Sequence, residues 1–164
     1  MSKQTNINSL EFAEKSLEIH DIIAPLDLGR LADMLHGRDG ELRYALKGSI
    51  DKQGKPQLEL HLQGKLNLVC QRCLGAVEFA LDSTTRFIIV ASEEMLPAPE
   101  DEDDTVDYMV ADQHLSVEAL IEDEVLLSLP LAPAHEQCSP EASGTHEQKE
   151  SPFKILQGLK LGRN

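Results

Sequence analysis

The centre of the chain alternates apolar and polar side chains, which is the pattern of a β-strand with one buried face. The alternation covers residues 42–50, stops at the polar sequence 53–56 and returns over residues 58–68. The apolar positions of the second segment are all leucine: Leu58, Leu60, Leu62, Leu66 and Leu68. The two segments predict a long antiparallel hairpin that covers a core with one face. Gly48 and Gly64 within it are interpreted as bulges or bends.

Three further segments extend the predicted sheet. Residues 17–23 are a short apolar segment that ends near Pro25, and we interpret them as an edge strand. Residues 77–90 begin as an alternating strand and end as a continuous apolar run, and a short strand is expected at residues 106–110. We therefore expect an α+β fold in which an antiparallel sheet, open or barrel-like, is combined with two or three short helices.

Helical spacing of the apolar residues occurs twice. The first predicted helix begins with Asp27 as its N-cap and stops at Gly37. The second is capped by Ser116 and runs to about Leu129. The face of this helix that is expected to point inward consists of Val117, Leu120, Ile121, Val125 and either Leu127 or Ser128.

These elements make up one predicted domain, residues 17–138, with flexible ends. Residues 1–16 are polar and are expected to be a flexible N-terminus, and residues 139–151 have the composition of a polar linker. Residues 152–164 mix apolar with basic side chains, which is typical of a docking peptide or of a helix that folds back onto its own sheet. The candidate partner contacts in this peptide are Pro152, Phe153, Leu156 and Leu159.

Charge is distributed unevenly along the chain, whose net charge is −14. Residues 87–148 contain sixteen of the 29 acidic residues and no Lys or Arg, so the remainder is nearly neutral. The densest acidic run, residues 100–104, lies in a predicted flexible acidic loop, residues 91–107. Such a surface attracts a basic partner and repels phosphate, or is simply solvated. Aromatic content of 4% without Trp also argues against single-stranded nucleic acid as the ligand.

The chain lacks the sequence features of an exported or membrane-spanning protein. The first twenty residues carry charges and no apolar run of signal-peptide length, and no run of about 18 apolar residues occurs anywhere. Three cysteines are an odd number and fit a reducing compartment. A cytoplasmic location is therefore expected.

The cysteines carry the most specific candidate chemistry. Cys70 and Cys73 form a Cys-x-x-Cys turn between two predicted strands, and His135 and Cys138 follow about sixty residues later. Together they are a Cys₃His set that is able to hold structural zinc, and reduced, metal-free cysteines are the alternative. A thioredoxin-like redox role requires the motif at a helix N-terminus, which the strand context disfavours.

No other motif predicts catalysis. The run Glu122, Asp123 and Glu124 in the second helix is able to bind magnesium or to act in acid–base chemistry, but in a helix it is more typical of a solvated face. We expect these three carboxylates to be partner contacts. The sequence therefore predicts a binding protein rather than an enzyme.

Three separated segments resemble one family. They are residues 68–73 around the Cys-x-x-Cys turn, residues 117–133 around the Glu-Asp-Glu run, and Pro152-Phe153. In order and spacing they resemble the large ribosomal RNA subunit accumulation protein family, YceD, from about residue 17 to the end. The matching positions are Cys70, Cys73, Glu122, Asp123, Glu124, Pro130, Pro133, Cys138, Pro152 and Phe153. Some family members are richer in cysteine after the second proline, where this chain has Cys138 with His135 nearby.

The resemblance implies a bacterial or plastid-type cytoplasmic factor for the synthesis, processing or stability of 23S rRNA, without enzymatic activity. The acidic region favours a basic ribosomal protein or assembly factor as the direct partner. Direct contact with 23S rRNA or a pre-50S particle would instead use the basic residues of the sheet. These are Arg43, Lys47, Lys52, Lys55, Lys65, Arg72 and Arg86. Neither a membrane nor a small-molecule substrate is expected.

Overall fold

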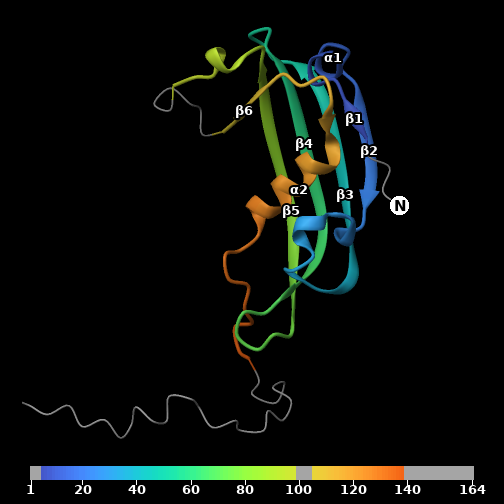
Figure 1. The fold of residues 1–164 in the computed structure, drawn as a ribbon, viewed down its shortest axis with the longest axis vertical. Coiled ribbons are helices and arrows are strands. Elements are labelled where there is room, and N and C mark those ends of the chain that lie inside the picture. Colours follow the sequence, from blue (N-terminus) through green and yellow to red (C-terminus); the bar gives the residue numbers. More distant parts are fainter. Residues whose placement is uncertain (1–4, 99–104, 139–164) are drawn as a thin grey trace, which may run out of the picture.

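Long strands that lie side by side form one open sheet in the computed structural model, which describes residues 5–98 and 105–138 (Figure 1). The strand order is β2-β3-β4-β5-β6. The strands span Glu18–Ile23 (β2), Leu35–Ile50 (β3), Pro56–Val69 (β4), Ala76–Val90 (β5) and Asp107–Val110 (β6). β2 to β5 pair antiparallel, which confirms the predicted hairpin and the edge strand.

The sheet is not closed, so the barrel-like alternative is wrong. Its edge strands β2 and β6 have six and four residues, whereas the central strands have 14 to 16, and the two edges do not pair with each other. The sheet is also not purely antiparallel, because β6 runs parallel to β5. The chain reaches β6 through the long connection after Val90 rather than through a tight hairpin, and this permits the parallel pairing.

The predicted alternation is confirmed, since the five leucines of β4 are at most 1% exposed. Of the two interpretations of Gly48 and Gly64, the bulge is wrong, because the register between β3 and β4 is unbroken from Gly40 to Ile50. A Cβ atom at Gly48 would lie 2.3 Å from the carbonyl oxygen of Phe12. Glycine is therefore required there by the close approach of a second backbone.

Two helices, α1 (Ser9–Glu14) and α2 (Val117–Ser128), pack on the leucine-bearing face of the sheet, and Figure 1 shows α2 in front of β4 and β5. We call this the core face and the opposite one the outer face. Ser116 caps α2, as predicted, by accepting the N–H of Ala119 at 3.2 Å. The predicted inward residues Val117, Leu120, Ile121 and Val125 are buried, whereas Leu127 is exposed.

Two local predictions near the N-terminus are wrong. Residues 6–14, expected to be flexible, form β1 (Asn6–Ile7), which pairs with β7 (Leu115–Ser116), and then α1. Burial of Phe12 and Ala13 against the sheet holds α1, a contact with residues distant in sequence. The helix expected from Asp27 to Gly37 is instead two 3₁₀ turns, Pro25–Asp27 and Gly29–Leu31, and Gly37 lies in β3. Gly29, within the expected helix, disfavours a continuous α-helix.

One further 3₁₀ turn, Glu93–Met95, follows β5. Neither α1 nor α2 in the described ranges is long and apolar enough to cross a membrane. The acidic run 100–104, the linker 139–151 and the docking peptide with Pro152, Phe153, Leu156 and Leu159 lie outside the described residues.

Candidate functional site

The Cys-x-x-Cys motif forms the turn between β4 and β5, as predicted. The N–H of Cys70 donates to the carbonyl of Gly75 at 2.8 Å, and the N–H of Leu74 donates to the carbonyl of Cys70 at 2.9 Å. Leu74 has a φ of 61°, a left-handed conformation that folds the chain back sharply. The N–H of Arg72 points at the Cys70 sulfur, at 3.4 Å. The turn therefore directs the backbone N–H of Arg72 at the sulfur of Cys70.

The segment that follows α2 returns to this turn. The carbonyl of Pro133 accepts the N–H of Gln71 at 2.8 Å, and the carbonyl of His135 accepts Nη1 of Arg72 at 3.3 Å. None of the residues from 131 to 138 is buried, and Leu131 is fully exposed. A few hydrogen bonds, rather than apolar burial, place His135 and Cys138 beside the turn.

The four predicted ligands come together, and their donor atoms all lie within 4.8 Å of one another. The sulfurs of Cys70 and Cys138 are 3.7 Å apart, and Nδ1 of His135 lies 3.4 Å from the Cys73 sulfur and 3.9 Å from the Cys138 sulfur. In tetrahedral zinc with bonds of about 2.3 Å to sulfur and 2.0 Å to nitrogen, ligand atoms are separated by roughly 3.5–3.8 Å. The residues therefore fit a tetrahedral metal ion.

The imidazole of His135 is oriented for ligation through Nδ1. Its Nε2 lies 2.8 Å from the carbonyl oxygen of Ala76. A carbonyl only accepts, so Nε2 carries the hydrogen and Nδ1 keeps its lone pair. Such a backbone partner fixes the ring and its tautomer in metal sites. The sequence offered no signal for this contact, because Ala76 contributes only its backbone.

The thiols are unequal before any metal binds. Burial opposes ionisation of Cys70, but the backbone N–H groups of the turn and of His135 outweigh it and lower its pKa to about 5. Burial and the neighbouring sulfurs of Cys70 and Cys73 raise the pKa of Cys138. A bound divalent cation would favour the thiolate of all three cysteines. The chemistry of the donor set is thus compatible with a metal ion that prefers thiolate ligands.

The Glu-Asp-Glu run does not form the solvated face that its sequence predicts. Glu122 accepts both the backbone N–H and Nε of Arg30, each at 2.6 Å, and its side chain is only 13% exposed. Asp123 pairs with Nη2 of the same arginine at 2.7 Å and is the exposed member. Glu124 is buried on the core face and accepts the hydroxyl of Thr85 at 2.6 Å. Two of the three carboxylates therefore hold α2 in place.

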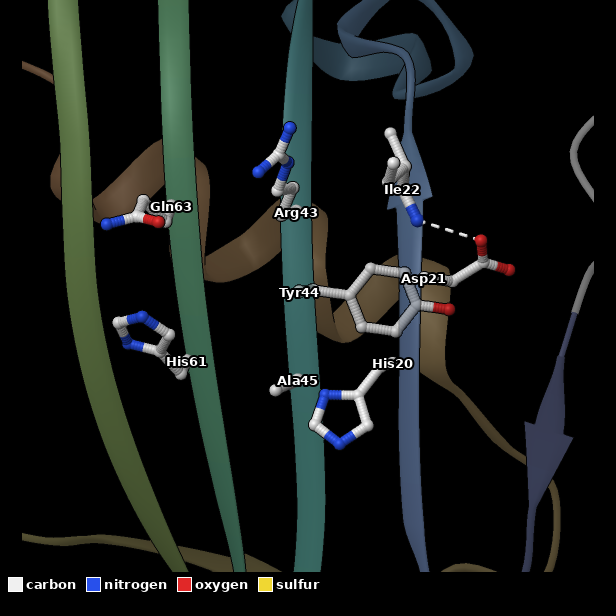
Figure 2. A pocket seen from close by; sticks show the side chains of 8 residues that line it. All are labelled: His20, Asp21, Ile22, Arg43, Tyr44, Ala45, His61 and Gln63. Carbon is white, nitrogen blue, oxygen red and sulfur yellow. Dashed lines mark hydrogen bonds between the residues drawn. The ribbon is translucent and has the colours of Figure 1, made fainter.

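A hollow of about 490 Å³ opens on the outer face beside the edge strand (Figure 2). It is lined by His20, Asp21, Ile22, Arg43, Tyr44, Ala45, His61 and Gln63. Two of the basic side chains that line it already contact a carboxylate: His20 lies 2.9 Å from Glu18, and Nε of Arg43 lies 3.0 Å from Glu41. The sequence predicted a polar face here but not the hollow.

Comparison with known families gives one match. The model of the large ribosomal RNA subunit accumulation protein YceD matches residues 58–160, well over half of the chain. The chain belongs to this family. The match confirms the resemblance seen in the sequence, although it begins at residue 58 rather than near residue 17. No solved structure matches the chain.

The YceD match includes both arms of the Cys₃His set, the turn after β4 and the segment after α2. It also includes the helix that bears Glu122 and Glu124. The elements that place the candidate metal ligands are thus part of the family region, whereas β1, α1, β2 and β3 precede it.

Proposed function

We propose that this YceD-family chain is a non-enzymatic, cytoplasmic factor of large-subunit biogenesis that supports the accumulation of 23S rRNA. The family match carries the proposal, because the family is named for the accumulation of this RNA. The chain acts on the synthesis, processing or stability of 23S rRNA by binding a basic ribosomal protein, an assembly factor or the RNA itself.

The shape of the Cys₃His set supports a structural role rather than a catalytic one. Four protein donors already surround the space in which a metal would sit. Structural zinc sites are closed in this way, whereas catalytic sites have three protein ligands and keep one position for water or substrate. We propose that Cys70, Cys73, His135 and Cys138 hold one structural zinc ion, which ties the segment after α2 to the turn between β4 and β5.

The alternative is a thiol-redox protein that uses Cys70 and Cys73. It is less well supported, because the pair occupies a turn between strands and lacks the helix N-terminus on which thioredoxin-like motifs depend. All three cysteines are free thiols in the structure.

The proposed role is tested in a strain that lacks the gene for this chain. We expect such a strain to contain less 23S rRNA relative to 16S rRNA, and the full chain to restore the ratio. A normal ratio in the deletion strain contradicts the proposed function. Full restoration by the double variant Cys70→Ser, Cys73→Ser, together with absence of metal from the purified wild-type chain, would remove both the zinc and the redox proposals and leave the role in 23S rRNA accumulation in place.

The metal proposal is tested separately by elemental analysis of the full chain purified without chelators. We expect about one zinc per chain, in line with a single four-ligand site. Cys73→Ser and Cys138→Ser should lose the metal. His114→Ala, which changes a histidine outside the set, should retain it. Wild-type chain without metal would show that the cysteines are simply reduced.

A further inference from the structure

A second hollow lies at the opposite end of the sheet from the metal ligands, where β3 turns into β4 (Figure 1). Its volume is about 490 Å³, within the range of roughly 300–1,000 Å³ that is typical of ligand pockets. Basic and polar side chains line it, above all Lys52, Lys55, Gln57, Arg86 and Tyr108. We call it the hairpin hollow.

The ion pairs of the described residues leave the three cations of the hairpin hollow, Lys52, Lys55 and Arg86, without a carboxylate partner. Across residues 5–98 and 105–138, no carboxylate forms an ion pair with Lys52, Lys55 or Arg86. Asp51 is the acidic residue in the lining, and its carboxylate accepts the backbone N–H groups of Gln53 and Lys55 at 2.7 and 2.8 Å. That carboxylate therefore stabilises the turn. Glu59 lies opposite Arg86 in the register of β4 and β5, but no ion pair joins the two, so among the described residues the cations of the hollow have no carboxylate bound to them.

Other basic residues of the sheet are less available. Arg43 and Lys65 pair with Glu41 and Glu78, at 3.0 and 2.8 Å. Arg72 contacts the carbonyl of His135 beside the candidate metal centre. Of the seven basic residues that the sequence suggested for RNA contact, the structure thus gathers three in one hollow.

The position of the hollow separates it from the acids of α2. Gln57, Ile88 and Tyr108 are aligned across neighbouring strands on the outer face, whereas α2 covers the core face. Charges of a folded protein are screened over about 8 Å at physiological ionic strength. The cations of the hairpin hollow can therefore attract an anionic ligand at contact distance, whereas the carboxylates of α2, on the other face of the sheet, repel it only weakly.

The lining combines two chemistries. Lysine and arginine bind phosphate, and Arg does so with a fork of donors that matches phosphate oxygens. Tyr108 adds an aromatic ring, and nucleic-acid bases stack on such rings without regard to sequence. The low aromatic content of the chain argues against an extended stacking platform, but one tyrosine beside three cations is enough for one nucleotide.

We propose that the hairpin hollow binds a phosphodiester of single-stranded RNA, with Lys52, Lys55 and Arg86 on the phosphate and Tyr108 against a base. The proposal rests on the role in 23S rRNA accumulation and assigns the RNA itself as a direct partner. Binding is expected to be weak and sensitive to salt, with a Kd on the order of 10 µM at low salt, because the net charge of −14 opposes a polyanion.

The test measures binding of a fluorescein-labelled 12-nucleotide oligouridylate to the full chain from 50 to 200 mM KCl. The double variant Lys55→Gln, Arg86→Gln should bind about tenfold more weakly at 50 mM KCl. The slope of log K against log salt should lose about 1.4, which is two contacts at about 0.7 each. The matched control Arg38→Gln, Lys65→Gln removes the same charge elsewhere and should change Kd by less than about twofold.

Tyrosine fluorescence gives a second readout, because the chain has no Trp and two Tyr. Unlabelled RNA should quench the emission of wild type and of Tyr44→Phe, but not that of Tyr108→Phe. Equal weakening by the control pair would overturn the proposal, since net charge would then explain binding. Competition by polyaspartate as strong as that by RNA would also overturn it and indicate an acidic protein partner.

Failure here is distinguishable from failure of the proposed function. If the chain does not bind the oligouridylate at 50 mM KCl while it restores 23S rRNA in the deletion strain, the hollow is not an RNA site and the biogenesis role stands. If the deletion strain has normal 23S rRNA, the biogenesis role falls, whatever the binding assay shows.

Discussion

Removal of the Glu122 carboxylate should destabilise the fold far more than removal of its neighbour Asp123. Glu122 accepts two hydrogen bonds from Arg30 at 2.6 Å and is 13% exposed, whereas Asp123 makes one contact with the same arginine and is 56% exposed. Loss of the Glu122 carboxylate removes two hydrogen bonds between charged or polar groups, and a hydrogen bond to a charged group contributes about 1.5–3 kcal/mol. Exposed ion pairs contribute only about 0–1 kcal/mol.

We therefore expect Glu122→Ala to lower the free energy of unfolding by about 2 kcal/mol and Asp123→Ala by about 0.5 kcal/mol. For a chain of this size the first loss corresponds to a fall in Tm of roughly 4–8 °C. Urea titrations and thermal melts followed by circular dichroism at pH 7 measure both variants. Equal losses from the two variants, or a Glu122→Ala melting point within about 1 °C of wild type, would refute the reasoning.

The pH dependence of this loss has a definite sign. Burial opposes ionisation of Glu122, but the hydrogen bonds with Arg30 outweigh it and hold the pKa below its usual value. A carboxyl whose pKa is lowered by folding contributes stability above its unfolded-state pKa and loses it as the pH falls through the folded-state pKa. The difference between wild type and Glu122→Ala should therefore persist at neutral pH and shrink below about pH 4.3.

The same pair of variants separates structure from recognition. If Asp123 is a partner contact, Asp123→Ala should lower 23S rRNA in the complemented strain while the purified variant stays close to wild-type stability. Glu122→Ala, in contrast, should reduce both together. If the level of 23S rRNA falls only in those variants whose stability also falls, Glu122, Asp123 and Glu124 have no role in recognition.

Gly48→Ala should lower the free energy of unfolding in urea by about 2–3 kcal/mol, because the new Cβ atom would meet the backbone of α1. Gly29→Ala should lower it by less than about 1 kcal/mol, because nothing lies within 4 Å of its Cβ position. Equal losses from the two variants would contradict the close contact at Gly48. Burial raises the pKa of Glu124, so its ionisation opposes folding and stability falls as the pH rises through its folded-state pKa. Thr85→Val removes a hydrogen bond that favours the ionised form of Glu124, so it should lower the free energy of unfolding by about 1–2 kcal/mol at pH 8 and by less at pH 5. A loss that does not depend on pH would contradict this role of Thr85. A zinc chelator should raise the rate of amide hydrogen exchange over residues 130–138 about tenfold and change the rate in α2 by less than about twofold, as measured by mass spectrometry. Exchange over residues 130–138 that the chelator does not change would show that no metal holds this segment.

The strands and the residues of the candidate metal site were accessible from the sequence because both depend on local information. Alternation with a period of two describes β3 to β5 directly, and the leucines of β4 fill the core as that period requires. Cysteine and histidine at short spacing indicate a ligand set before any fold is known. Cys73 and His135 do lie side by side in the fold, although they belong to separate parts of the chain, so the set is close enough to hold a metal ion.

Contacts between distant segments were not accessible in this way. The helix α1 is held because Phe12 and Ala13 find a partner surface on β3, a contact between distant segments. The local signal that could have found it is the N-cap Asn8 with Glu11 three residues later, whose N–H the Asn8 side chain accepts. Similarly, the carboxylates of Glu122 and Glu124 look like a solvated run until Arg30 and Thr85 approach them from other elements.

The sequence by itself determined the strand pattern, the capped second helix, the acidic bias and the four candidate metal ligands, because each is a property of neighbouring residues. The tertiary structure alone decided that the sheet stays open, that Glu124 is buried and that Lys55, Arg86 and Tyr108 share one hollow. Strand register and packing set these outcomes, since they bring together residues that no periodicity relates. Strand register and packing also place the Cys₃His set and the hairpin hollow at opposite ends of β4.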